Sequence, residues 1–231
     1  MIELVPEGFE ERERGADLEF AAYTDAHGGA RIARAFRVVS EDEVPSDWSE
    51  RWRSFHKPVR AGPFWVGPSW EGAPADAIPI VIDPGLAFGT GAHATTRLCL
   101  GLLAGVRPGS LLDAGCGSGV LCVAAAKLGF APVHAVDDDP LAVAAACENA
   151  ERNDATIEAR CADVLEAPLP RTDVVVANIA LDVVERLGPR LDVPELITSG
   201  YLERDRPQLE AFDHVERRVL AGWAADRFRV A

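Results

Sequence analysis

Three glycines and one acid stand where a nucleoside could be bound. Gly115, Gly117 and Gly119 alternate with other residues directly after an apolar run, and Asp137 ends the next apolar run, 22 positions after Gly115. Glycine lets a ligand approach the main chain, and a carboxylate at the end of a strand can accept hydrogen bonds from two ribose hydroxyls. The spacing leaves room for one helix between two neighbouring parallel strands. The pattern therefore predicts a nucleoside site at the carboxyl edge of a parallel sheet.

The order of the glycines bears on the kind of nucleoside. A dinucleotide loop reads G-x-G-x-x-G and binds a pyrophosphate at a helix N-terminus, whereas residues 115–119 read G-x-G-x-G. The shorter form favours S-adenosylmethionine, which has no phosphate to hold. An NAD site and a glycine-rich turn without a ligand remain open alternatives.

A second glycine-dense segment, DPGLAFGTGAHATTR, occupies residues 83–97 and precedes an apolar stretch at 98–103. Thr95 or Thr96 could serve as the N-cap of a helix over that stretch. A cap would still leave the run Phe88–Gly91 unexplained, because so many glycines are costly to order unless they contact something. We therefore expect a ligand-contacting loop that leads into a helix.

Composition excludes several classes of protein. The chain has 231 residues, 48% of them hydrophobic, and a net charge of −14, which repels nucleic acid and attracts basic macromolecules. Such a surplus of acid is also a common aid to solubility. No apolar run is long enough for a membrane span and the N-terminus does not read as a secretory signal, so we expect a cytoplasmic protein.

Cysteine and histidine usage indicates neither disulfides nor metal. The five cysteines occur in apolar segments or in the glycine loop without a C-x-x-C pair, so we expect reduced residues of the core. The five histidines are scattered without ligand spacing, and no metal site is expected.

Strand-like and helix-like segments alternate from about residue 110, which predicts a doubly wound α/β sheet. Strands are predicted at 110–114, 133–137, 157–161, 174–178 and 196–199, with 214–220 and 225–230 as an antiparallel pair at the edge. Helices are predicted at 118–128, 140–153, 181–191 and 205–212. Pro140 suits the first turn of its helix.

The preceding part of the chain divides into a small unit and a connection. Residues 1–44 predict a separate α+β unit, with a hairpin of 18–23 and 32–39 around His27–Gly29. Residues 45–70 contain four of the five tryptophans and predict a Trp/Pro-rich linker in which Trp48 and Trp52 share a helix face. We interpret these tryptophans as packing residues rather than as a cage for methylated amines. The main domain is then 71–231.

Several segments together carry a family resemblance. They are residues 83–96, the loop 113–119, Asp137–Pro140, Glu148–Asn153 and Val174–Ile179. On these the chain resembles the bacterial ribosomal protein L11 methyltransferase family of the PrmA type, from about residue 48 to residue 200. The resemblance implies a Rossmann-like seven-stranded methyltransferase sheet with helices on both faces. It also implies S-adenosylmethionine as the methyl donor, and lysine and N-terminal amines of a basic ribosomal protein as acceptors.

The resemblance also implies the cofactor-binding residues. Thr96 would lie near the methionine end, Gly115 would back the ligand, Asp137 would hold the ribose hydroxyls and Asn178 would face the methyl donor. A turn or cap role for Asn178 is the alternative. No catalytic acid or base is assigned, because the amine can lose its proton to solvent before it enters the site.

Two features bear on the acceptor. Ile179 and Ala180 follow Asn178, where methyltransferases of planar amides and bases carry two prolines, so an aliphatic amine is the better substrate. The family's N-terminal domain usually starts further upstream, so residues 1–44 look truncated as a substrate-recognition unit. We expect a monomer that binds no nucleic acid or membrane. The rival hypotheses are an NAD-dependent oxidoreductase and a non-catalytic cofactor-binding module in ribosome assembly.

Overall fold

A computed structural model describes residues 10–14, 17–21, 32, 34, 57–83 and 91–231 of the chain. The chain forms two compact units, Met1–Phe55 and His56–Ala231. The predicted linker, 45–70, lies partly outside the described residues. Its described part belongs to the second unit and contains strands β3 (Val59–Ala61) and β4 (Phe64–Gly67).

The first unit contains a hairpin of β1 (Glu10–Arg14) and β2 (Asp17–Ala21), which pair antiparallel with Glu10 opposite Ala21. The predicted hairpin of 18–23 with 32–39 is therefore wrong, since β2 pairs with the strand before it and Ile32 and Arg34 are helical. Pairing of β2 with the nearer strand, β1, is favoured because a short connection costs less entropy to close than a long one. The remainder of 32–39, Trp48 and Trp52 lie outside the described residues.

A seven-stranded sheet organises the second unit, in the order β11-β12-β10-β9-β6-β7-β8. Its strands are β6 (Leu111–Ala114), β7 (Val133–Asp137), β8 (Glu158–Cys161), β9 (Val174–Asn178), β10 (Glu195–Leu202), β11 (Phe212–Leu220) and β12 (Trp223–Val230). Strands β8, β7, β6, β9 and β10 run parallel, and β12 and β11 add antiparallel pairs at one edge. The predicted doubly wound sheet with an antiparallel edge pair is confirmed.

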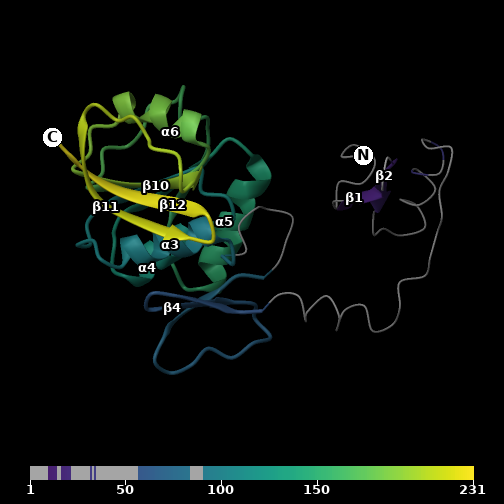
Figure 1. The fold of residues 1–231 in the computed structure, drawn as a ribbon. Helices are drawn as coiled ribbons and strands as arrows, with labels where there is room; N and C mark the ends of the chain where they lie inside the picture. Colours follow the sequence, from purple (N-terminus) through teal and green to yellow (C-terminus); the bar gives the residue numbers. More distant parts are fainter. Residues whose placement is uncertain (1–9, 15–16, 22–31, 33, 35–56, 84–90) are drawn as a thin grey trace. The chain divides into compact units, whose positions relative to one another are not determined.

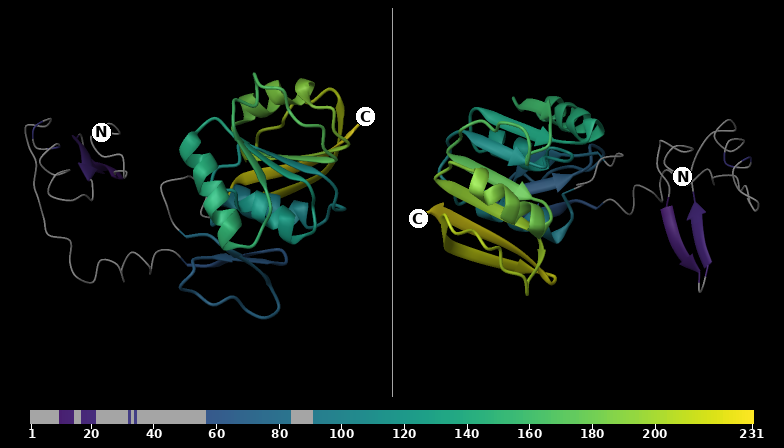
Figure 2. Two further views of the ribbon diagram at one scale, coloured as in Figure 1. Left: turned by 180° about the vertical axis from the view of Figure 1, so that it is seen from behind. Right: turned by 90° about the horizontal axis from the view of Figure 1, so that it is seen from above.

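The order of connections reverses between β6 and β9, so the carboxyl ends of these two strands mark a topological switch point. The chain leaves β6 toward β7 and β8 and then returns to β9 on the other side of β6. Because crossovers between parallel strands are right-handed, this reversal places α4 (Val120–Lys127) and α5 (Pro140–Arg152) on one face and α6 (Leu181–Leu187) on the other. Figure 1 shows α6 across the sheet from α4, and Figure 2 gives the same layers from behind and above. Ligands of open α/β sheets bind at such a reversal.

Each face of the sheet has its own core. One core includes Leu111, Val123 and Ala146 and continues into α3 (Ala94–Leu103) and a three-stranded sheet, β3-β4-β5, in which β5 is Ile78–Val81. The other core includes Leu112 and α6 residues such as Leu187. Adjacent residues of β6 thus serve opposite cores, as the alternation of a strand requires.

The predicted helices differ from the structure mainly at 205–212. The segments at 118–128 and 140–153 contain α4 and α5, with Pro140 in the first turn, and 181–191 contains α6 and a 3₁₀ turn, Gly188–Arg190. No helix forms at 205–212, and β11 begins at Phe212. Pro207 disfavours a helical residue before it, and the main-chain oxygen of Asp205 is held by Arg217.

Cysteine burial departs from the prediction at two of the five positions. Cys99, Cys116 and Cys122 are buried, whereas Cys147 and Cys161 are exposed, and all five are free thiols. Cys147 lies on the outer side of α5, and Cys161 ends β8, the last strand at one edge of the sheet. An apolar neighbourhood in sequence does not reveal which side of a helix or sheet meets solvent.

Within the described residues, no helix has both the length and the apolar character that a membrane span requires.

Candidate functional site

The glycine loop turns sharply out of β6. Gly115, Gly117 and Gly119 all have positive φ, at 77°, 51° and 77°. A side chain at Gly119 would place its Cβ 2.8 Å from the Cβ of Ala146, so glycine here also allows α4 to pack closely on α5. The loop therefore needs glycine both for its backbone angles and for its packing.

Asp137 is fixed by main-chain donors on both carboxylate oxygens. The amide of Gly117 donates to Oδ2 at 2.8 Å, and the amide of Asp139 donates to Oδ1 at 3.0 Å. The carboxylate is therefore bound to the glycine loop at the carboxyl end of β7. Each oxygen keeps lone-pair capacity, so the pair can still accept two hydroxyl hydrogen bonds.

Asn178 and Thr96 come together from distant parts of the chain. Asn178 ends β9 and donates from Nδ2 to Oγ1 of Thr96, in the first turn of α3, at 3.3 Å. Thr96 is 3% exposed. The residue after Asn178, Ile179, lies against Gly115, because a Cβ on Gly115 would overlap its Cγ2. The four predicted site residues thus belong to the loop after β6, to β7, to β9 and to α3.

The N-cap of α3 is His93 and neither of the predicted threonines. Its Nδ1 accepts from the amide of Thr95 at 3.4 Å and is 2.8 Å from Oγ1 of Thr95. The imidazole also packs edge-on against Trp223, with ring centroids 4.8 Å apart. Thr95 and Thr96 lie inside the helix, where both are buried. Histidine is an uncommon cap, so the sequence pattern favoured the hydroxyls.

Asp113 is a buried acid that the sequence reasoning did not single out. It is 1% exposed, its Oδ2 accepts from Sγ of Cys122 at 3.1 Å, and its Oδ1 has no hydrogen-bond partner among the described residues. Burial, opposed by the Cys122 hydrogen bond and assisted by the nearby charge of Asp137, raises the pKa of Asp113 to about 7. The sequence feature that indicates this residue is an acidic side chain within the apolar run of β6.

Two asparagines, Asn149 in α5 and Asn153 at its C-cap, are positioning residues that the sequence pattern did not reveal. Asn149 donates from Nδ2 to the main-chain oxygen of Ser118 at 2.9 Å and so holds the glycine loop. Asn153 donates to the oxygen of Val81 at 2.7 Å and accepts from the amide of Val81 at 2.8 Å, which fixes the end of β5. Their spacing of four residues, which puts both on one helix face, could have revealed them.

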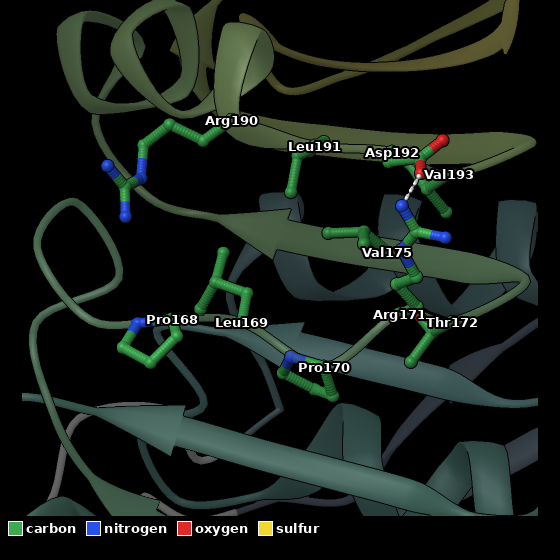
Figure 3. A pocket seen from close by; sticks show the side chains of 10 residues that line it. All are labelled: Pro168, Leu169, Pro170, Arg171, Thr172, Val175, Arg190, Leu191, Asp192 and Val193. Atoms are coloured by element: carbon green, nitrogen blue, oxygen red, sulfur yellow. Dashed lines mark ion pairs between the residues drawn. The ribbon is translucent and has the colours of Figure 1, made fainter.

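A separate cavity of about 430 Å³ lies at the opposite edge of the sheet (Figure 3). It is lined by the segments before β9 and β10, which include Leu169 and Leu191, and by Val175 of β9. Arg171 is paired to Asp192 at 2.9 Å. None of the four predicted site residues lines it. Among the described residues no group of three histidine, cysteine, aspartate or glutamate side chains is arranged to hold a metal ion.

The parallel-rich seven-stranded sheet, the glycine loop after β6 and the acid at the end of β7 define a Rossmann-like methyltransferase fold. The model of the family described as "Ribosomal protein L11 methyltransferase (PrmA)" matches residues 13–222. The chain belongs to this family.

Similar proteins agree with this membership. The chain is 49% identical over 187 residues to a ribosomal protein L11 methyltransferase of Pelotomaculum thermopropionicum, covering 76% of this chain and 59% of that protein. It is 38% identical over 229 residues to the one of Pelobacter propionicus, covering 90% and 73%. A crystal structure of ribosomal protein L11 methylase from Lactobacillus delbrueckii subsp. bulgaricus superposes with a TM-score of 0.68 at 30% identity, covering 75% of this chain and 98% of that one. The chain thus spans little more than half the length of some of its relatives.

Proposed function

We propose that this chain is an S-adenosylmethionine-dependent protein N-methyltransferase that methylates lysine and N-terminal amines of ribosomal protein L11. The observation that carries the proposal is the fixed carboxylate of Asp137, which accepts from Gly117 and Asp139 and still has capacity for a ribose. Family membership supports the acceptor.

The residues present fit the cofactor. Asp137 would accept the ribose hydroxyls, Gly115 and Gly117 would let the nucleoside lie against the main chain, and Thr96 with Asn178 would lie near the methionine end. A side chain at Gly115 would fill space now occupied by Ile179, so this part of the cradle tolerates only glycine without rearrangement. When bound, the cofactor supplies an electrophilic methyl group on a sulfonium.

The chain's own residues would align the acceptor and exclude water. Transfer to an amine needs donor and acceptor in line, and holding them so can supply several kcal/mol of the barrier reduction. Asn178 offers one acceptor and two donors at the carboxyl edge of the sheet. We assign no general base, since an amine can enter after losing its proton to solvent.

The net charge of −14 favours a basic ribosomal protein over nucleic acid as the partner. We further propose that residues 1–44 help to recognise that protein and that 45–70 connect them to a methyltransferase domain at 71–231, with β3 and β4 of the connection forming part of the second unit. The chain would act in the cytoplasm as a monomer.

The rival enzyme class is an NAD-dependent oxidoreductase. Its hydride relay would need a histidine near the loops, and His93 is already engaged as the cap of α3 and with Trp223. The rival without catalysis is a cofactor-binding module in ribosome assembly.

Incubation with methyl-labelled S-adenosylmethionine and purified ribosomal protein L11, followed by mass spectrometry, tests the proposal. Labelled lysine or N-terminal amines support it, and cofactor binding without any label favours the module.

A further inference from the structure

Ile179 lies between two glycines, one in the loop after β6 and the other within β10. Its side chain lies against Gly115, after β6, and its main chain lies against Gly200, within β10. Its amide donates to the oxygen of Ser199 at 3.1 Å. The peptide that leaves Asn178 is thus held from the side of the glycine loop and from the side of β10.

Gly200 occupies an irregularity of β10. Ser199 pairs with Ala225 of β12 and Tyr201 with Ala224, so Gly200 is the extra residue of a β-bulge. Its φ is +104°, an angle that residues with a side chain rarely adopt. The bulge lies beside the end of β9, where Ser199 is in register with Asn178.

The approach of Ile179 to Gly200 is made by main-chain atoms. A Cβ on Gly200 would lie 2.6 Å from the carbonyl carbon of Ile179, 3.0 Å from its nitrogen, and closer still to its carbonyl oxygen. A flexible side chain that met the added Cβ could rotate away from it, but a peptide group held within the packed main chain cannot. Any side chain at this position would therefore displace the main chain of Ile179, the residue that follows Asn178.

We propose that Gly200 is a positioning residue, whose missing side chain lets the main chain of Ile179 lie against β10 and so keeps the preceding residue, Asn178, where its side-chain amide bonds to Thr96. The inference rests on the proposed function, in which Asn178 faces the methyl donor. The ribose end depends on Asp137 and the loop after β6, whereas the three atoms nearest to a Cβ on Gly200 all belong to Ile179. Displacing the main chain of Ile179 should therefore slow transfer much more than it weakens nucleoside binding.

Gly200→Ala tests this inference, with Gly129→Ala as the matched control. Gly129 also has a positive φ, +90°, but no atom lies within 4 Å of an added Cβ, so the control carries the backbone strain without the collision. In the ligand-free proteins, the side-chain amide resonances of Asn178 should shift in Gly200→Ala and stay in place in Gly129→Ala. With ribosomal protein L11 and labelled donor, turnover of Gly200→Ala should fall about 10- to 100-fold, as expected for misplacement of about 1 Å. Affinity for S-adenosylhomocysteine should change by less than about threefold, because the bonds that fix Asp137 come from Gly117 and Asp139 and share no partner with Gly200.

A second variant keeps the test decisive if Gly200→Ala does not fold. Ile179→Ala removes the side chain that lies against Gly115, leaves the main chain intact and should also shift the Asn178 amide and lower turnover. An unmoved Asn178 resonance with turnover equal to Gly129→Ala would overturn the inference while the proposed function stands. A wild-type protein that transfers no methyl group would instead refute the proposed function, and the resonance comparison would then decide on its own whether Gly200 positions Asn178.

Discussion

Nδ2 of Asn178 donates a hydrogen bond to Oγ1 of Thr96 across 3.3 Å, joining the end of β9 to the first turn of α3. Residues 82 positions apart are thereby brought to the same edge of the sheet. The bond links the two glycine-rich segments of the sequence, because Thr96 follows one of them and Ile179, next to Asn178, lies against the other.

Replacing Thr96 by valine should remove the acceptor and keep the shape. We expect a loss of about 1 kcal/mol in the free energy of unfolding, typical of one hydrogen bond. The rate of methyl transfer should fall on the order of tenfold, because Asn178 loses its orienting partner. Thr95→Val is the control, since Thr95 is equally buried but bonds to His93. Equal rates in the two variants would show that the bond does not orient Asn178 for transfer.

Asp137→Ala should weaken the binding of S-adenosylhomocysteine by about 1–3 kcal/mol, because it removes a charged acceptor from two hydroxyls. Isothermal titration calorimetry measures the change. Asp138→Ala removes an exposed neighbouring carboxylate and should leave the affinity unaltered. An unchanged affinity in Asp137→Ala would rule out the ribose role.

Asp113 should make the protein less stable as the pH rises from about 4 to about 7. Burial raises its pKa in the folded state to about 7, from the ordinary value of 3.8. The folded state therefore holds this proton more tightly than the unfolded chain, and the stability it contributes at low pH is lost as the pH passes through the folded pKa. Urea unfolding of wild type and Asp113→Asn at pH 5 and pH 8 measures the effect.

Between pH 5 and pH 8 the free energy of unfolding of the wild type should fall by on the order of 2 kcal/mol more than that of Asp113→Asn. Glu148→Gln, an exposed carboxylate on α5, should behave as the wild type does. If wild type and Asp113→Asn follow the same pH dependence, Asp113 titrates normally and the argument from its burial fails.

Asp226 is the centre of a buried polar cluster at the antiparallel edge. It is 1% exposed and accepts from His214 at 2.8 Å, from Arg217 at 2.9 Å and from the hydroxyl of Tyr201 at 2.9 Å. Asp226→Ala would leave the guanidinium of Arg217 without its buried partner. We expect a loss of about 3–5 kcal/mol in the free energy of unfolding, measured by denaturant titration.

Asp213→Ala, at an exposed position of the same strand pair, should change stability by less than about 0.5 kcal/mol. A similarly small loss in Asp226→Ala would mean that the cluster is a solvated surface network.

Local patterns predicted the sheet and the strand ends at which the candidate site residues lie. The strands before Gly115, Asp137 and Asn178 are apolar runs whose carboxyl ends must meet at one edge, so the sequence alone brings these residues together. What it could not predict depends on pairing between distant strands. The need for glycine at position 200 arises from the bulge of β10 against β12 and the approach of Ile179.

The failed helix at 205–212 has a related cause. Its pattern suits a helix, but Arg217 on β11 holds the main-chain oxygens of Glu203 and Asp205 in another conformation. The pairing of β2 with β1 was missed because the turn signal at His27–Gly29 outweighed a closer partner that has little apolar character.

Calorimetric titration of the whole chain with S-adenosylhomocysteine and, separately, with NAD is the most direct measurement. The site formed by Gly115, Asp137 and Asn178 should bind S-adenosylhomocysteine, one molecule per chain, and give no heat of binding with NAD. Binding of NAD without binding of S-adenosylhomocysteine would contradict the account and support the oxidoreductase.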